Sequence, residues 1–107
     1  MAHKDEAAEL RRLWDQVRRG SLPELAGNEH AVQELALYQS WVGSIAESAI
    51  ERGGRLTAEH RKLLDVRREE GSQALWRAAG DLGESARSQL ARLLAVESLL
   101  GKLPVDR

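Results

Sequence analysis

The apolar residues of this chain recur at the three- and four-residue spacing of amphipathic helices, and glycines interrupt them at intervals. The clearest run is 29–52, where apolar residues step by four and three along one face: Ala31, Leu35, Tyr38, Val42, Ile45 and Ala49. Leu37 and Trp41 widen this stripe. Gly53 and Gly54 follow directly and supply the backbone conformation of a helix C-cap. The pattern therefore predicts one long helix over 29–52.

The same periodicity appears before this run. A helix is predicted over about 5–18, where four apolar residues share one face: Leu10, Leu13, Trp14 and Val17. Gly20 is expected to end this helix. A short turn over 22–26 is expected next, because Ser21 and Glu24 have the spacing of a capping box.

A third helix is predicted over 58–79, with Thr57 as its N-cap residue. Its middle, residues 67–73, contains no apolar side chain, and it includes Gly71. A glycine inside a helix costs about 1 kcal/mol relative to alanine. One continuous helix is the prediction, and a break near Gly71 is the alternative.

The last predicted helix covers 82–101 and has a leucine-rich face: Ala86, Leu90, Leu93, Leu94, Val96, Leu100 and Leu103. Gly80 is expected to end the preceding helix. Asp81 and Glu84 have the spacing of a capping box, which places the start of the last helix between them. Gly101 is expected to close it.

These segments predict an all-α fold in a single domain over 1–107. The expected architecture is a small antiparallel helical bundle of three long helices, with an N-terminal helix packed across them. Short connections between long helices favour antiparallel neighbours. We find no internal repeat that would indicate a different architecture.

The antiparallel arrangement also predicts which residues face each other. Tyr38 is expected opposite Gly71, so that the glycine makes room for the tyrosine ring. Glu97 interrupts the leucine-rich face of the last helix. Because an unpaired carboxylate is costly in such a place, we expect an ion pair between Glu97 and Arg61 or Arg68.

Composition limits the function classes. The chain has 107 residues, of which 42% are hydrophobic and 31% charged, and it has no cysteine and a net charge of −1. Disulfides and thiolate chemistry are therefore excluded, and no global field attracts nucleic acid. No apolar run approaches the ~20 residues of a membrane span, and no secretory signal is recognised, so a cytoplasmic protein is expected. The excess of arginine over lysine suggests a GC-rich bacterial genome.

Candidate catalytic and metal-binding residues are sparse. His30 and Glu34 are four residues apart, but a metal site needs three or four such groups. Glu47 and Glu51 lie on one helix face without a nucleophile beside them. Residues 53–55 lack the pattern of a phosphate-binding loop. We therefore expect no enzyme activity, no metal and no cofactor.

The function that remains is protein interaction through an apolar helix face, as in an adaptor, an export-type chaperone or an assembly subunit. The candidate contact residues are Leu13, Trp14, Val17, Leu37 and Trp41. The partner is expected to be another protein or a second copy of this chain. In the alternative interpretation, the N-terminal helix covers Leu37 and Trp41 as ordinary core.

A small DNA-binding regulator is the second hypothesis. Its contacts would come from a basic corner around the 53–57 turn: Arg52, Arg55, Arg61, Lys62, Arg67 and Arg68. Acidic residues interleave with these side chains, and the net charge is negative. The two helices of a helix-turn-helix motif also cross each other at a steep angle, whereas the apolar stripes of this chain favour antiparallel packing. Nucleic acid is therefore the less favoured partner.

Two resemblances bear on this interpretation. Trp41, Val42 and Gly43 resemble the signature of the WXG family of small secreted helical hairpins. That family places the motif at its hairpin turn, whereas the apolar stripe here continues to Ala49. In size, composition and layout the chain is also similar to small helical export chaperones of flagellar and type III systems. That similarity implies a movable element over a partner groove, but no functional residues are carried over.

Overall fold

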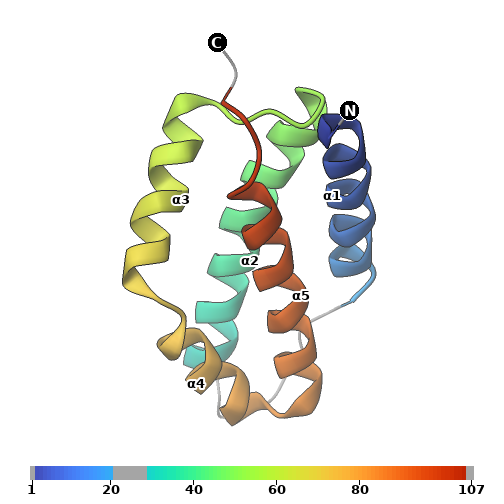
Figure 1. Ribbon diagram of the computed structural model, residues 1–107. Helices are drawn as coiled ribbons and strands as arrows, with labels where there is room; N and C mark the ends of the chain where they lie inside the picture. The colour runs from blue at the N-terminus through green and yellow to red at the C-terminus, as the bar shows by residue number, and fades with distance from the viewer. Residues whose placement is uncertain (1, 21–28, 106–107) are drawn as a thin grey trace.

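The computed structural model describes residues 2–20 and 29–105, so the turn predicted over 22–26 lies outside the described residues. The described chain forms five helices (Figure 1): α1 Ala2–Arg19, α2 Glu29–Glu51, α3 Ala58–Glu70, α4 Gln73–Leu82 and α5 Glu84–Leu100. Its described residues contain no strand, and the one isolated bridge joins Leu56 to Val105. The prediction of an all-α fold is confirmed.

The predicted helix over 58–79 is two helices, so the prediction of one continuous element is wrong. α3 ends at Glu70, and Gly71 adopts φ +78° and ψ −177°. Only glycine occupies this region of the backbone map readily, and it cannot continue a helix. α4 then starts at Gln73, after Ser72. The break near Gly71 is therefore a property of the fold.

Gly80 does not end a helix, contrary to the sequence prediction. α4 continues through Gly80 and Asp81 to Leu82, and the chain turns at Gly83, where φ is +107°. Because Asp81 lies inside α4, it does not cap α5, and the expected capping box with Glu84 is wrong. Glycine at 83, not 80, supplies the positive φ that the turn requires.

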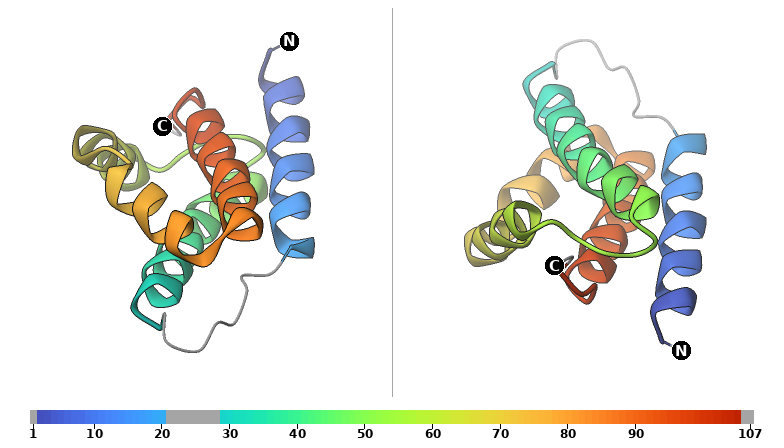
Figure 2. Two further views of the ribbon diagram at one scale, coloured as in Figure 1. Left: turned by 90° about the horizontal axis from the view of Figure 1, so that it is seen from below. Right: turned by 90° about the horizontal axis from the view of Figure 1, so that it is seen from above.

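The hydrophobic core lies among α1, α2, α4 and α5. α1 packs against α5 and α2, and α4 packs against the same two helices. The views along the molecule show α5 between α1 and α4 (Figure 2). The fully buried side chains of the core are mostly leucines, among them Leu10, Leu35, Leu90, Leu93 and Leu100.

α3 stands apart from this core. Its backbone approaches the other helices less closely than they approach one another, and Leu64 is its buried residue. Side chains and the chain ends connect it to the rest: the amide of Leu56 donates to the carbonyl of Pro104 at 2.9 Å. Within residues 2–20 and 29–105, no helix combines the length and apolar character that crossing a bilayer requires.

Candidate functional site

The structure divides the predicted contact residues between the core and the surface. Trp14 is 7% exposed and Val17 is fully buried, so both belong to the core under α1. Leu13 is half-buried against the same cluster. Leu37 is 64% exposed, which makes it the most exposed large hydrophobic side chain among the described residues. The five residues therefore do not form one surface.

α1 does not cover Leu37, so the alternative that assigned it to the core is wrong. The Trp14 ring of α1 lies against Gly43 on α2. Trp41 precedes Gly43 by two residues, and two residues rotate the helix by about 200°. Trp41 therefore faces away from α1 and toward α3. Its ring stacks on Tyr38, one turn earlier on α2, with 6.2 Å between ring centroids.

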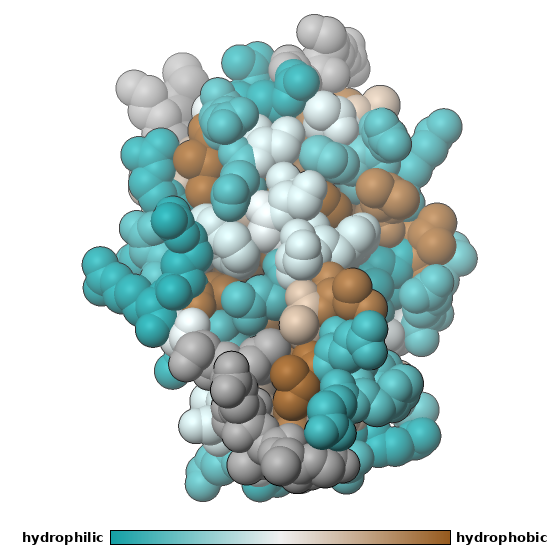
Figure 3. Space-filling model, turned by 180° about the vertical axis from the view of Figure 1, so that it is seen from behind, coloured by the Kyte–Doolittle hydropathy of each residue, from teal (hydrophilic) through white to brown (hydrophobic). Residues whose placement is uncertain are grey.

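A groove runs between α2 and α3 on this side. Part of it is an apolar hollow of about 310 Å³, lined by Tyr38, Trp41, Leu63, Val66, Arg67 and Glu70. Leu63 is 41% exposed and Val66 is 56% exposed, so α3 presents apolar side chains outside the core. Figure 3 shows the face over α2 and α3, where hydrophobic residues lie among polar ones. Leu37 precedes Trp41 by one helical turn and extends this apolar surface.

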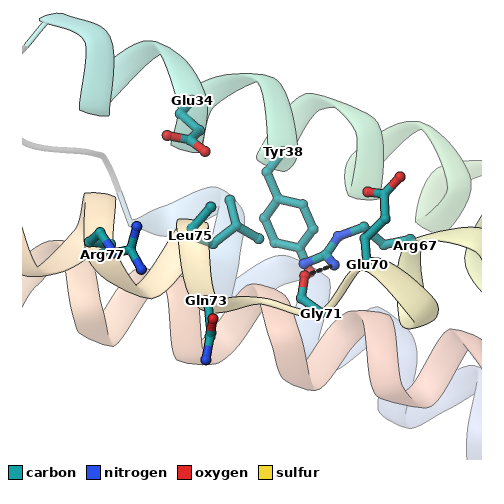
Figure 4. A pocket seen from close by; sticks show the side chains of 9 residues that line it. Glu34, Tyr38, Arg67, Glu70, Gly71, Gln73, Leu75 and Arg77 are labelled. Carbon is teal, nitrogen blue, oxygen red and sulfur yellow. Dashed lines mark hydrogen bonds between the residues drawn. The ribbon is translucent and has the colours of Figure 1, made fainter.

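The groove continues toward α4 as a second hollow of about 430 Å³ (Figure 4). Its lining is more polar and consists of Glu34, Tyr38, Arg67, Glu70, Gly71, Gln73, Ala74, Leu75 and Arg77. Tyr38, Arg67 and Glu70 belong to both hollows, which makes them one continuous depression. We call the whole depression, together with Leu37, the α2–α3 groove.

Two residues that line the groove, Tyr38 and Arg67, form a polar cluster with Glu97 of α5. The Tyr38 hydroxyl donates a hydrogen bond to the Glu97 carboxylate. Nε of Arg67 lies 3.8 Å from Oε1 of Glu97, and its guanidinium carbon lies 5.0 Å from the centre of the Tyr38 ring. Burial, together with the adjacent Glu97 carboxylate, raises the pKa of Tyr38 well above its usual range. The cluster is therefore a neutral phenol beside a compensated ion pair.

Glu97 has an arginine partner, but the predicted identity of that arginine is wrong. Arg67 pairs with Glu97, whereas Arg61 donates to the carbonyls of Gly101 at 3.0 Å and Leu103 at 2.6 Å. Arg68 lines a hollow on the α5 side that Glu97 also lines, but the guanidinium recorded beside the Glu97 carboxylate is that of Arg67. The break at Gly71 explains the error, because the facing register was derived for a helix that continues through this position.

The proposed role of Gly71 as a space for Tyr38 is also wrong. Both residues line the same hollow, so they do lie on facing sides. A Cβ at Gly71 would meet nothing within 4 Å, however. Glycine is required at this position for its positive φ, which lets the carbonyl of Gly71 accept a hydrogen bond from Arg67.

The basic corner of the DNA hypothesis is partly engaged within the molecule. Arg61 and Arg67 make the internal hydrogen bonds described above, and their side chains are largely buried against α5 and the chain end. Arg55 donates to the carbonyl of Arg52 at 3.3 Å. Lys62 is exposed. The structure therefore does not present the predicted residues as one outward-facing basic surface.

His30 is exposed at the start of α2, and Glu34 lies in the α2–α3 groove. Among the described residues, no three His, Asp or Glu side chains are grouped so that they could hold a metal ion. Sequence reasoning missed Leu63 and Val66 because they lie outside the expected inner face of the third helix. Their spacing of three residues is the signal that could have identified them. In comparisons with known proteins, the chain matches no protein family, no curated protein and no solved structure.

Proposed function

We propose that the protein is a non-enzymatic interaction module, such as an adaptor, an export-type chaperone or an assembly subunit. Its binding surface is the α2–α3 groove, and its partner contributes a helix. The antiparallel bundle formed with α1, α4 and α5 acts as the support for this surface. The proposal keeps Leu37 and Trp41 from the sequence hypothesis and replaces Leu13, Trp14 and Val17 by Leu63 and Val66.

The exposure of Leu63 and Val66 beside Trp41 carries this proposal. Leu63 and Val66 occupy adjacent turns of α3, and both lie on the hollow that Trp41 lines. An apolar strip between two helices suits the i, i+3, i+4 and i+7 side chains of an amphipathic helix. A hollow of about 310 Å³ has room for anchoring side chains without a large rearrangement.

The polar cluster supports binding because it holds the groove side chains Tyr38 and Arg67 in place. Tyr38 is fixed by Glu97 at its hydroxyl, by Trp41 at one ring face and by the Arg67 guanidinium. A surface whose side chains are already ordered loses less conformational entropy when a partner binds. Tyrosine, tryptophan and arginine are also the residue types that contribute most at interface centres.

Photo-crosslinking in the native cells tests the proposal. A photoreactive amino acid replaces Leu63 in one variant and Val66 in another, and it replaces the exposed Ala95 of α5 in the control. We expect a discrete protein adduct from positions 63 and 66 but not from position 95. Leu37→Ser should reduce that adduct severalfold. Equal adducts from all three positions, or none from α3, would contradict the proposed surface.

A further inference from the structure

We infer that the partner helix is basic: an apolar stripe flanked by lysine or arginine side chains. This inference rests on the proposed function and names the chemistry of its partner. It follows from the distribution of charge around the α2–α3 groove. Oppositely charged rims guide association and select among partners, even where they add modestly to affinity.

Carboxylates lie along both sides of the groove. Glu34 of α2 and Glu70 of α3 line its hollows, and Glu70 belongs to both of them. Glu59 precedes Leu63 by four residues, and Glu69 follows Val66 by three. On a helix these spacings place the side chains beside one another. The apolar residues of α3 are therefore bordered by acidic side chains that are exposed to solvent.

Two of the three arginines of α3 make contacts away from this rim, and the third, Arg67, lines the groove beside an internal carboxylate. Arg61 donates to the carbonyls of Gly101 and Leu103, near the end of the described chain. Arg67 lines the groove, but its charge is compensated by Glu97 of α5. Arg68 lines the hollow on the α5 side of the helix. The fold therefore separates the charges of a helix whose sequence mixes both signs.

Two further cations lie near the groove besides the paired Arg67. Lys62 precedes Val66 by four residues, and Arg77 lines the α4 end of the larger hollow, which Glu34 also lines. Lys62 and Arg77 are fewer than the carboxylates of the rim, which are Glu34, Glu59, Glu69 and Glu70. A basic helix can pair with Glu70, Glu69 and Glu59 along α3, whereas an acidic helix would meet like charges there.

Two synthetic peptides of equal length test the inference. Both carry leucines at i, i+3, i+4 and i+7 spacing, and the remaining positions are lysine in one and glutamate in the other. The reporter is the fluorescence of Trp41 in the Trp76→Phe variant. Trp14 is 7% exposed and contributes a constant signal. We expect the lysine peptide to bind at least about tenfold more tightly than the glutamate peptide in low salt.

A matched pair of variants separates local from overall charge. Glu34→Gln with Glu70→Gln removes two rim carboxylates, and Asp81→Asn with Glu84→Gln removes two exposed carboxylates at the α4–α5 junction. The net charge changes equally. We expect the rim variant to weaken lysine-peptide binding roughly threefold to tenfold, and the junction variant to change it less than twofold.

Each outcome decides one of the two proposals. If both peptides bind with equal Kd, or if the two variants have equal effects, the basic partner is contradicted while the binding surface stands. If neither peptide changes the fluorescence of Trp41 at millimolar concentration, the proposed surface itself is contradicted. Circular dichroism of each variant confirms that the helices are retained before binding is compared.

Discussion

The indole of Trp14 lies directly against the bare backbone of Gly43. A Cβ at Gly43 would come within 2.5 Å of Cη2 and 2.8 Å of Cζ2 of this ring. Trp14 is 7% exposed, so the ring cannot swing into solvent without opening the core. The close approach of α1 to α2 therefore depends on the absence of a side chain at position 43.

Gly43→Ala should lower the free energy of unfolding by about 1–3 kcal/mol, because the new methyl group overpacks against the Trp14 ring. This loss should exceed the gain of about 1 kcal/mol in helix propensity. Urea unfolding followed by circular dichroism measures the difference. Gly80→Ala is the matched control: it also lies within a helix, but nothing is within 4 Å of its Cβ, so it should stabilise. Equal stabilisation by both substitutions would show that the Trp14 contact is not tight.

Deletion of residues 1–19 should abolish cooperative unfolding. The deletion removes Leu10, Trp14 and Val17 from the core, and α5 and α2 lose the helix that covers them. It also removes the carbonyl of Val17, to which the buried side chain of Gln89 donates at 3.0 Å. A thermal melt by circular dichroism should show a broad transition without a defined midpoint. A sharp transition in the truncated protein would mean that α1 is a removable cover.

Gly71→Ala should destabilise the protein by about 1–3 kcal/mol, because alanine rarely adopts φ +78° with ψ −177°. The cause is the backbone and not the neighbours, since there is open space where the methyl group would be placed. Gly80→Ala again serves as the control, because its backbone is helical. Unfolding in urea measures both variants. A stability unchanged from wild type would indicate that α3 can run on into α4 as one helix.

Because of Tyr38, the free energy of unfolding should fall as the pH rises into the alkaline range. The unfolded phenol loses its proton near its ordinary pKa of 10.0, whereas burial and then Glu97 raise the pKa of the folded phenol. The folded state therefore binds more protons above pH 10, and stability falls as pH rises beyond that value. One proton corresponds to about 1.4 kcal/mol per pH unit. Urea unfolding measured between pH 9 and 11.5 should show this decline.

Tyr38→Phe is the control for the alkaline effect, and it should flatten the decline while the other titrating groups remain. Tyr38 is the only tyrosine of the chain, so tyrosinate absorbance reports on this residue alone. In wild type, the absorbance should rise together with unfolding and not before it. A rise near pH 10 in a protein that is still folded would show that the Tyr38 hydroxyl is accessible and not bonded to Glu97.

Much of the fold follows from local patterns. α2 was predicted to within one residue, because its apolar stripe is continuous and Gly53 follows with a positive φ. The end of α4 differs from the prediction, which placed a helix end at Gly80. Gly80 and Gly83 are both plausible helix stops when the sequence alone is considered. Gly83 adopts the positive φ, and the preceding Leu82, the last residue of α4, is buried in the assembled core.

The candidate site was less predictable because it depends on how far α3 stands from α2. Leu37 and Trp41 are predicted from the sequence as contact residues, whereas the three-residue spacing of Leu63 and Val66 places them on one helix face without showing what that face lies against. Leu63 and Val66 are exposed because α3 stands apart from the core formed by the other four helices. Tertiary arrangement, and not helix propensity, determines that Leu64 is buried while Leu63 is not.

A partner helix that binds in the α2–α3 groove should perturb the residues on both sides of it. The most direct test records ¹⁵N–¹H spectra of the protein during titration with the lysine peptide. We expect progressive shifts for the backbone amides of 37–44 and 61–70 and for the indole N–H of Trp41, while the amides of α1 and the indole of Trp14 stay in place. Shifts centred on α1 and α5, with residues 61–70 unchanged, would contradict binding in this groove.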